Sequence, residues 1–95
     1  MQVTEVYSHW LPLLIGADAV TIGTTIYYKM AKHRVWGSLR KHEMVHVDQY
    51  AKYGVVVFLL IYFYEYILGR IKGLTHSQAY RNIGFEKEAF EKQKL

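Results

Sequence analysis

Two histidines separated by three residues constrain this chain more than any other feature of its sequence. His42-Glu43-Met44-Val45-His46 is an H-E-x-x-H motif. Both imidazoles can reach one ion only if the segment is an α-helix, because residues four apart then lie one turn from each other. Gly37-Ser38 predicts the start of this helix, with Ser38 as its N-cap, and Gly54 predicts its end. We therefore expect a helix that carries the histidine pair on one face.

The motif predicts a zinc ion held by nitrogen and oxygen ligands. The chain contains no cysteine, which excludes thiolate ligands as well as disulfides. On a helical wheel His42, His46 and Glu43 share a face with Leu39 and Tyr50, so the histidines are expected to point inward. Glu43 would then lie beside the ion and act as a general base. The alternative is a pair of core histidines that bind no metal, since the same inward positions suit them.

A catalytic zinc site needs a third protein ligand, and the last predicted helix supplies Glu86. The wheel places Glu86 between Phe85 and Ala89, where an unpaired carboxylate would be strongly disfavoured and a cation would remove the penalty. Glu88 is the main rival, but it falls with the solvated charges. The remaining alternative is that Glu86 pairs with Arg81 or lies at a frayed helix end.

Two residues just before Glu86 are candidate donors to a developing oxyanion. These are Tyr80 and His76, which are its polar neighbours in the sequence. Tyrosine usually packs in cores or interfaces, so a packing role for Tyr80 stays open. His9 and His33 have no partner at metal-ligand spacing and are expected on the surface or in loops.

The rest of the chain predicts a single α+β domain over residues 1–95 that is mostly helical. The segment 19–28 alternates in Val, Ile, Thr and Tyr around Gly23, which predicts a β-hairpin or one kinked strand. The segment 3–15 contains Pro12 and predicts a short helix or irregular stretch. Thr75-His76-Ser77-Gln78 has the spacing of a capping box, and Asn82 with Gly84 separates that helix from the last one.

The motif and the last helix together resemble a known family. Lys41-His42-Glu43-Met44-Val45-His46-Val47-Asp48-Gln49, followed later by Tyr80-Arg81-Asn82-Ile83-Gly84-Phe85-Glu86-Lys87-Glu88-Ala89, is similar to the short gluzincin-type metallopeptidase domains of bacteria and their phages. The resemblance runs from about Val20 to the C-terminus. It implies a minimal zincin-like fold in which the two motif histidines and Glu86 bind zinc.

The same resemblance implies an activity and a mode of substrate binding. The activity is hydrolysis of peptide bonds in a peptide or protein, and the strand near Thr21 to Tyr28 would be an edge strand that binds an extended substrate. Two positions depart from the family. Gly84 stands where Pro is common, and Phe90 stands where an Asp often supports the site, so we expect that support to be missing.

Charge and hydropathy bear on partners. The net charge of +4 favours acidic surfaces, without the dense basic clusters of nucleic-acid binders, and the N-terminal residues predict no signal peptide, so we expect a cytoplasmic protein. The apolar run 55–68 is shorter than a bilayer crossing requires, which favours a buried helix or an interfacial helix peripheral to a membrane. A membrane span and a homodimer contact stay open as alternatives. A second hypothesis is therefore a membrane-associated or oligomeric interaction protein with a structural or degenerate zinc site.

Overall fold

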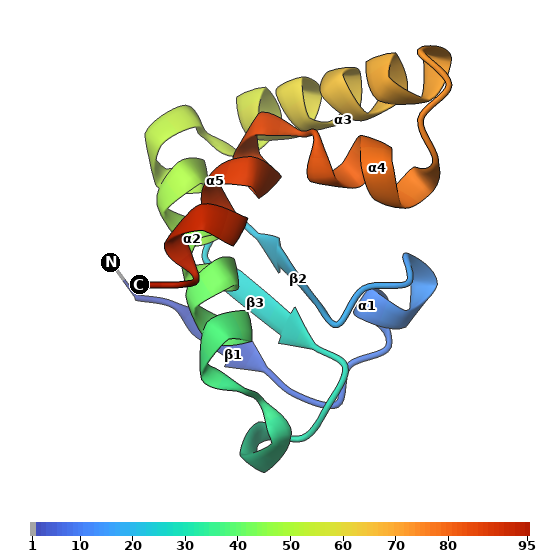
Figure 1. Cartoon of the computed structure of the whole chain (residues 1–95). Coiled ribbons are helices and arrows are strands. Elements are labelled where there is room, and N and C mark those ends of the chain that lie inside the picture. The colour runs from blue at the N-terminus through green and yellow to red at the C-terminus, as the bar shows by residue number, and fades with distance from the viewer. Residues whose placement is uncertain (1) are drawn as a thin grey trace.

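A computed structural model describes residues 2–95, which form an α+β fold of helices packed on one small sheet (Figure 1). The elements follow one another along the chain as β1 (Thr4–Val6), α1 (Leu11–Leu14), β2 (Ala19–Ile22), β3 (Thr25–Tyr28), the 3-10 turn η1 (Lys32–Arg34), α2 (Gly37–Tyr53), α3 (Val55–Ile71), α4 (His76–Arg81) and α5 (Gly84–Lys92). The predicted α+β class is confirmed.

The sheet has the order β1-β3-β2. β2 and β3 form the predicted antiparallel hairpin, and Gly23 in its turn has a φ of 63°, which glycine adopts without strain. β1 pairs in parallel with β3 and was not predicted, because its three residues are too few to show a period. β3 is therefore the central strand, so the prediction of an edge strand holds for β2 and is wrong for β3.

Helix α2 crosses the sheet and joins two groups of buried side chains. Ile26 and Tyr28 of β3 are fully buried and pack with Val47 of α2. One turn further along α2, Tyr50 packs with aromatic side chains of α3 and α5, and the rings of Tyr50 and Phe58 stack 3.9 Å apart. The segment of α2 that bears the motif thus lies between the sheet on one side and α5 on the other (Figure 1).

The helix ends follow the sequence with one exception. α2 begins at Gly37 with Trp36 as its N-cap, and no side chain caps it, so the prediction that Ser38 is the N-cap is wrong. Gly54 ends α2 as predicted and also precedes α3, at a φ of 82° and ψ of 158°. The two helices bend by 115° at this point.

The predicted capping box begins α4. The backbone N–H of Gln78 donates to Thr75 Oγ1, and the backbone N–H of Thr75 donates to Gln78 Oε1. Asn82 ends the helix and α5 starts two residues later. Within residues 2–95 no single helix has the length and hydropathy to cross a bilayer, although α2 and α3 taken together as a bent pair do.

Candidate metal centre

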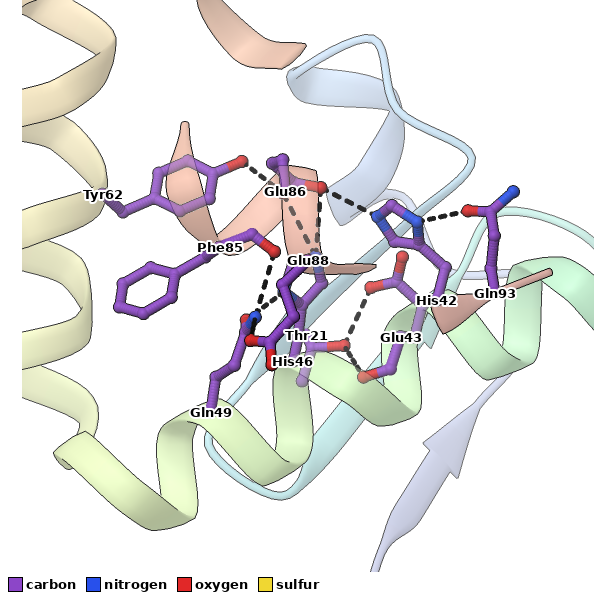
Figure 2. Close-up of polar contacts among 10 residues, drawn as sticks. All are labelled: Thr21, His42, Glu43, His46, Gln49, Tyr62, Phe85, Glu86, Glu88 and Gln93. Atoms are coloured by element: carbon purple, nitrogen blue, oxygen red, sulfur yellow. Dashed lines mark hydrogen bonds and ion pairs between the residues drawn. The ribbon is translucent and has the colours of Figure 1, made fainter. Parts of the chain in front are cut away.

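His42 and His46 of α2 meet Glu86 of α5 in a buried cluster, as the sequence predicted (Figure 2). His42 Nε2 lies 2.8 Å from Glu86 Oε1, and His46 Nε2 lies 3.2 Å from Glu86 Oε1 and 3.1 Å from Oε2. One ligand atom from each residue falls within 4.8 Å of the others. The alternative in which Glu86 pairs with Arg81 is wrong, since the Arg81 guanidinium lies over the Phe90 ring instead.

Close packing of α5 on α2 produces this convergence. Ala89, one turn after Glu86, is fully buried, and its small side chain lets the two helices approach. Phe85 precedes Glu86 and packs on Phe58 of α3, with ring centroids 4.4 Å apart. The apolar residues on either side of Glu86 therefore fix its helix and direct the carboxylate at the histidines.

The other nitrogen of each imidazole meets a glutamine. His46 Nδ1 lies 2.8 Å from Gln49 Oε1, and His42 Nδ1 lies 2.6 Å from Gln93 Oε1. The Gln49 amide is fixed in this orientation because its Nε2 donates to the Phe85 carbonyl and to Glu88 Oε1. An amide oxygen can only accept, so each Nδ1 carries a proton and the neutral imidazole presents the lone pair of Nε2 to Glu86.

This arrangement has the chemistry to hold a cation. In neutral imidazoles both Nε2 lone pairs and the carboxylate of Glu86 are acceptors, and acceptors at 2.8 to 3.2 Å repel unless something positive lies between them. Four ligands at about 2.1 Å around zinc are roughly 3.4 Å apart, which is close to these separations. The residues present therefore fit a tetrahedral zinc ion with three protein ligands.

Without an ion, protonation supplies the positive charge. Burial by itself lowers the pKa of His46, but the hydrogen bond and charge of Glu86 outweigh it and raise the pKa to about 9. Burial likewise raises the pKa of Glu86, yet hydrogen bonds from His42 and His46 outweigh it and hold the pKa well below its usual range. The cluster thus attracts positive charge, whether a proton or a metal.

Glu43 lies in the same buried region and is held by the sheet. The Thr21 hydroxyl of β2 donates to Glu43 Oε1 at 2.8 Å (Figure 2). Burial raises the pKa of Glu43, while the nearby His46 and the Thr21 hydrogen bond act against this rise. Glu43 is thus a carboxylate with a raised pKa beside the candidate metal ligands, which makes it a candidate general base.

Four residues around the site escaped the sequence analysis: Thr21, Gln49, Tyr62 and Gln93. Tyr62 of α3 donates to Glu86 Oε2 at 2.7 Å, which holds the carboxylate from the side opposite α2 (Figure 2). Its position, four residues after the buried Phe58, gives a signal, because a hydroxyl on the buried face of an apolar helix needs a partner. Gln49 gives a similar signal, one turn after His46 on the inner face of α2.

Both departures from the family have structural counterparts. The Phe90 ring packs edge-on against His42 with centroids 4.6 Å apart, so no carboxylate stands at this position. His42 Nδ1 has a hydrogen-bond partner in Gln93 instead. Gly84 donates its backbone N–H to Glu65 Oε1 at 2.8 Å, a bond that Pro at this position could not form.

A cavity of about 520 Å³ reaches the site from the surface. His42 and Glu43 line it, together with Tyr80 and His76 of α4, and the segment 15–19 and Trp36 form part of its wall. Burial raises the pKa of Tyr80, and the charge of Glu86 adds to the rise, so this hydroxyl stays protonated and can donate. His76 is exposed, and its Nδ1 lies 2.9 Å from the Tyr66 hydroxyl. The structure thus brings Tyr80 close to Glu86 and leaves His76 further out along the cavity.

His9 and His33 do not belong to the cluster of His42, His46 and Glu86. His9 accepts the backbone N–H of Leu11, and His33 is exposed in η1, as predicted for both. A second cavity of about 550 Å³ lies beside Gln49 and Phe85, with Glu88 and Lys92 in its wall, and neither motif histidine lines it.

Comparison of this chain with protein families, curated proteins and solved structures finds no match.

Proposed function

We propose that this protein is a small zinc-dependent metallopeptidase of the gluzincin type that its motifs resemble. His42, His46 and Glu86 would bind the zinc, and Glu43 would act as the general base. The observation that carries the proposal is the meeting of both Nε2 atoms with the Glu86 carboxylate, beside Glu43 and at the end of an open cavity. Three protein ligands with a neighbouring carboxylate and solvent access are typical of catalytic rather than structural zinc sites.

Each residue of the site would have its own role in hydrolysis. A bound zinc ion would supply acidity to water and polarise the substrate carbonyl. Glu43 would accept the proton of the attacking water and pass it to the leaving amine, and Thr21 would hold the carboxylate in place for both transfers. Tyr80, protonated and in the cavity wall, would donate to the oxygen on which negative charge develops.

The shape of the cavity supports an extended peptide or protein as substrate. Ala19, at the start of β2, lines it, and β2 pairs only with β3 among the described strands. A peptide that added to the free edge of β2 would run past Glu43, which Thr21 of the same strand contacts. The second hypothesis, a structural or degenerate zinc site, receives less support, because a structural ion has four protein ligands and no open cavity beside it.

Two measurements on the purified chain test the proposal. Metal analysis after dialysis against zinc should give one zinc per chain, and His42→Ala should give none. Glu43→Gln should keep the zinc and lose peptide hydrolysis by about a hundredfold or more. Glu91→Gln is the matched control, since Glu91 is an exposed glutamate of α5, and it should change neither property. Absence of zinc from the wild type, or undiminished hydrolysis by Glu43→Gln, would refute the proposal.

A further inference from the structure

One face of α3 carries a stripe of exposed apolar side chains. Figure 1 shows α3 along one side of the molecule, with α4 and α5 on its inner side. Each side chain of the stripe is between 54% and 76% exposed, and together we call them the α3 stripe: Val56, Leu60, Phe63, Tyr64, Ile67 and Ile71. At 100° per residue they fall within an arc of about 100° along the whole helix. An uninterrupted apolar surface of this length on a small domain indicates a binding surface.

Charges at the C-terminal end of α3 indicate what the stripe binds. Arg70 and Lys72 lie there and are exposed, whereas Lys52, before the start of α3, lines the cavity beside Glu65 and Glu88. The one acidic residue of α3, Glu65, lies on the opposite face, where its carboxylate accepts the backbone N–H of Gly84. The stripe therefore has positive charge at its C-terminal end and carries no negative charge.

This pattern favours an anionic lipid surface over a second copy of the chain. If two α3 helices paired in parallel, Arg70 and Lys72 of the two copies would lie side by side with no acidic partner in either stripe. A bilayer with anionic headgroups accepts these basic residues and the apolar stripe beside them. At 17 residues α3 is also shorter than the roughly 20 that a crossing needs, so it would lie in the plane of the surface.

We propose that the α3 stripe docks this protein onto anionic membrane surfaces, with α3 parallel to the bilayer. Phe63 belongs to the stripe and also lines the cavity that leads to Glu43. One wall of the cavity therefore lies beside the lipid when the protein is docked, which would favour substrates close to the membrane surface. The docking itself depends on α3 alone and is independent of zinc.

Flotation with vesicles tests the docking. The protein should float with vesicles of phosphatidylcholine containing phosphatidylglycerol, and much less with phosphatidylcholine alone. The double variant Arg70→Gln/Lys72→Gln should bind the anionic vesicles more weakly by about fivefold for each charge removed. The variant Lys87→Gln/Lys94→Gln makes the same change in net charge at exposed sites away from α3, and it should bind like the wild type.

A second test locates the contact. Because the chain has no cysteine, Leu60→Cys and Lys87→Cys each create one thiol for an environment-sensitive fluorophore. Emission from position 60 should shift to the blue on addition of anionic vesicles, and emission from position 87 should not. Leu60→Glu should reduce vesicle binding by at least about tenfold, whereas Leu95→Glu, also at an exposed leucine, should leave it unchanged.

Three results would overturn the proposal. The first is equal binding by the two charge variants, which would mean a non-specific attraction. The second is a blue shift at position 60 that depends on protein concentration in the absence of lipid, with a dimer in sedimentation that Leu60→Glu disrupts, since the stripe would then bind a second copy. The third is vesicle binding that resists alkaline carbonate extraction, which would indicate a span.

Discussion

His46 Nδ1 lies 2.8 Å from Gln49 Oε1, and the amide that fixes this bond is itself held by α5. The glutamine one turn after the motif therefore determines which nitrogen of His46 faces Glu86. His42 has the same kind of partner in Gln93, so both imidazoles are oriented by amides rather than carboxylates.

We predict that Gln49→Leu weakens zinc binding by about 10- to 100-fold, because His46 loses the acceptor that keeps its Nε2 free for the ion. The measurement is competition for zinc with a fluorescent chelator. Glu88→Gln is the control, since Gln49 keeps its bond to the Phe85 carbonyl and should stay in place. Equal losses in the two variants would show that the effect comes from packing around α5.

At position 93, the effect of a substitution on zinc affinity should depend on whether the new side chain accepts the hydrogen bond from His42 Nδ1. Gln93→Leu removes the partner of His42 Nδ1 and should weaken zinc binding by about tenfold, whereas Gln93→Glu supplies a carboxylate acceptor and should retain it. The same chelator competition compares the two variants. If leucine and glutamate gave the same affinity, the hydrogen bond to His42 would have no part in metal binding.

Thr21→Val should reduce peptide hydrolysis by about tenfold while zinc content stays unchanged, because Glu43 loses the hydroxyl that positions it. That hydrogen bond also lowers the pKa of Glu43, so the acid limb of the kcat/KM profile should move to higher pH in the variant. A Thr21→Ser variant keeps the hydroxyl and serves as the control. An unshifted acid limb would argue against Glu43 as the base.

Gly84→Pro should destabilise the protein by about 1 kcal/mol, since the bond from the Gly84 N–H to Glu65 is lost and the gain from a stiffer unfolded chain only partly offsets this loss. Urea denaturation measures the free energy of unfolding. In a Glu65→Leu background, which offers no acceptor for this N–H, the penalty should shrink. Independence of the two substitutions would mean that the bond contributes nothing.

Glu5 gives a pH dependence away from the metal centre. Burial raises its pKa, but hydrogen bonds from Arg40 and Tyr28 outweigh this and lower it from the ordinary 4.5. Because the folded-state pKa is depressed, the stabilisation is present above pH 4.5 and is lost as pH falls through the folded-state value. Carbon-detected NMR titration should give a Glu5 pKa below 4.5 in the wild type, closer to 4.5 in Arg40→Ala. A titration unaffected by Arg40→Ala would contradict this assignment.

The features predicted from the sequence are those that depend on residues close together in the chain. The helix of His42 and His46 follows from spacing, the turn at Gly23 from β alternation, and the α4 capping box from residues three apart. Glu86 was found because a lone carboxylate in an apolar stripe needs a partner, which is an energetic signal that survives without coordinates.

Most of the parts that were missed depend on distant contacts. Tyr62 is 24 residues from Glu86 and Thr21 is 22 residues from Glu43, so no local pattern connects them. β1 is too short to show alternation, and its pairing with the middle strand decided which strand is the edge. The Gln93 partner of His42 required the path of α5 across α2, which only the packed structure provides. Gln49 lies three residues after His46, so its bond was a local signal that the sequence analysis did not use.

Gly54 alone separates two helices of 17 residues, at backbone angles that residues with a side chain rarely adopt. α3 is about 25 Å long, so a rotation of a few degrees at Gly54 would swing its far end, and α4 packed on it, by an ångström or more. α2, with its histidines, would stay packed on the sheet. A change of the angle at Gly54 would therefore alter the width of the opening between α4 and the start of β2, and with it access to the centre, while His42 and His46 stayed in place.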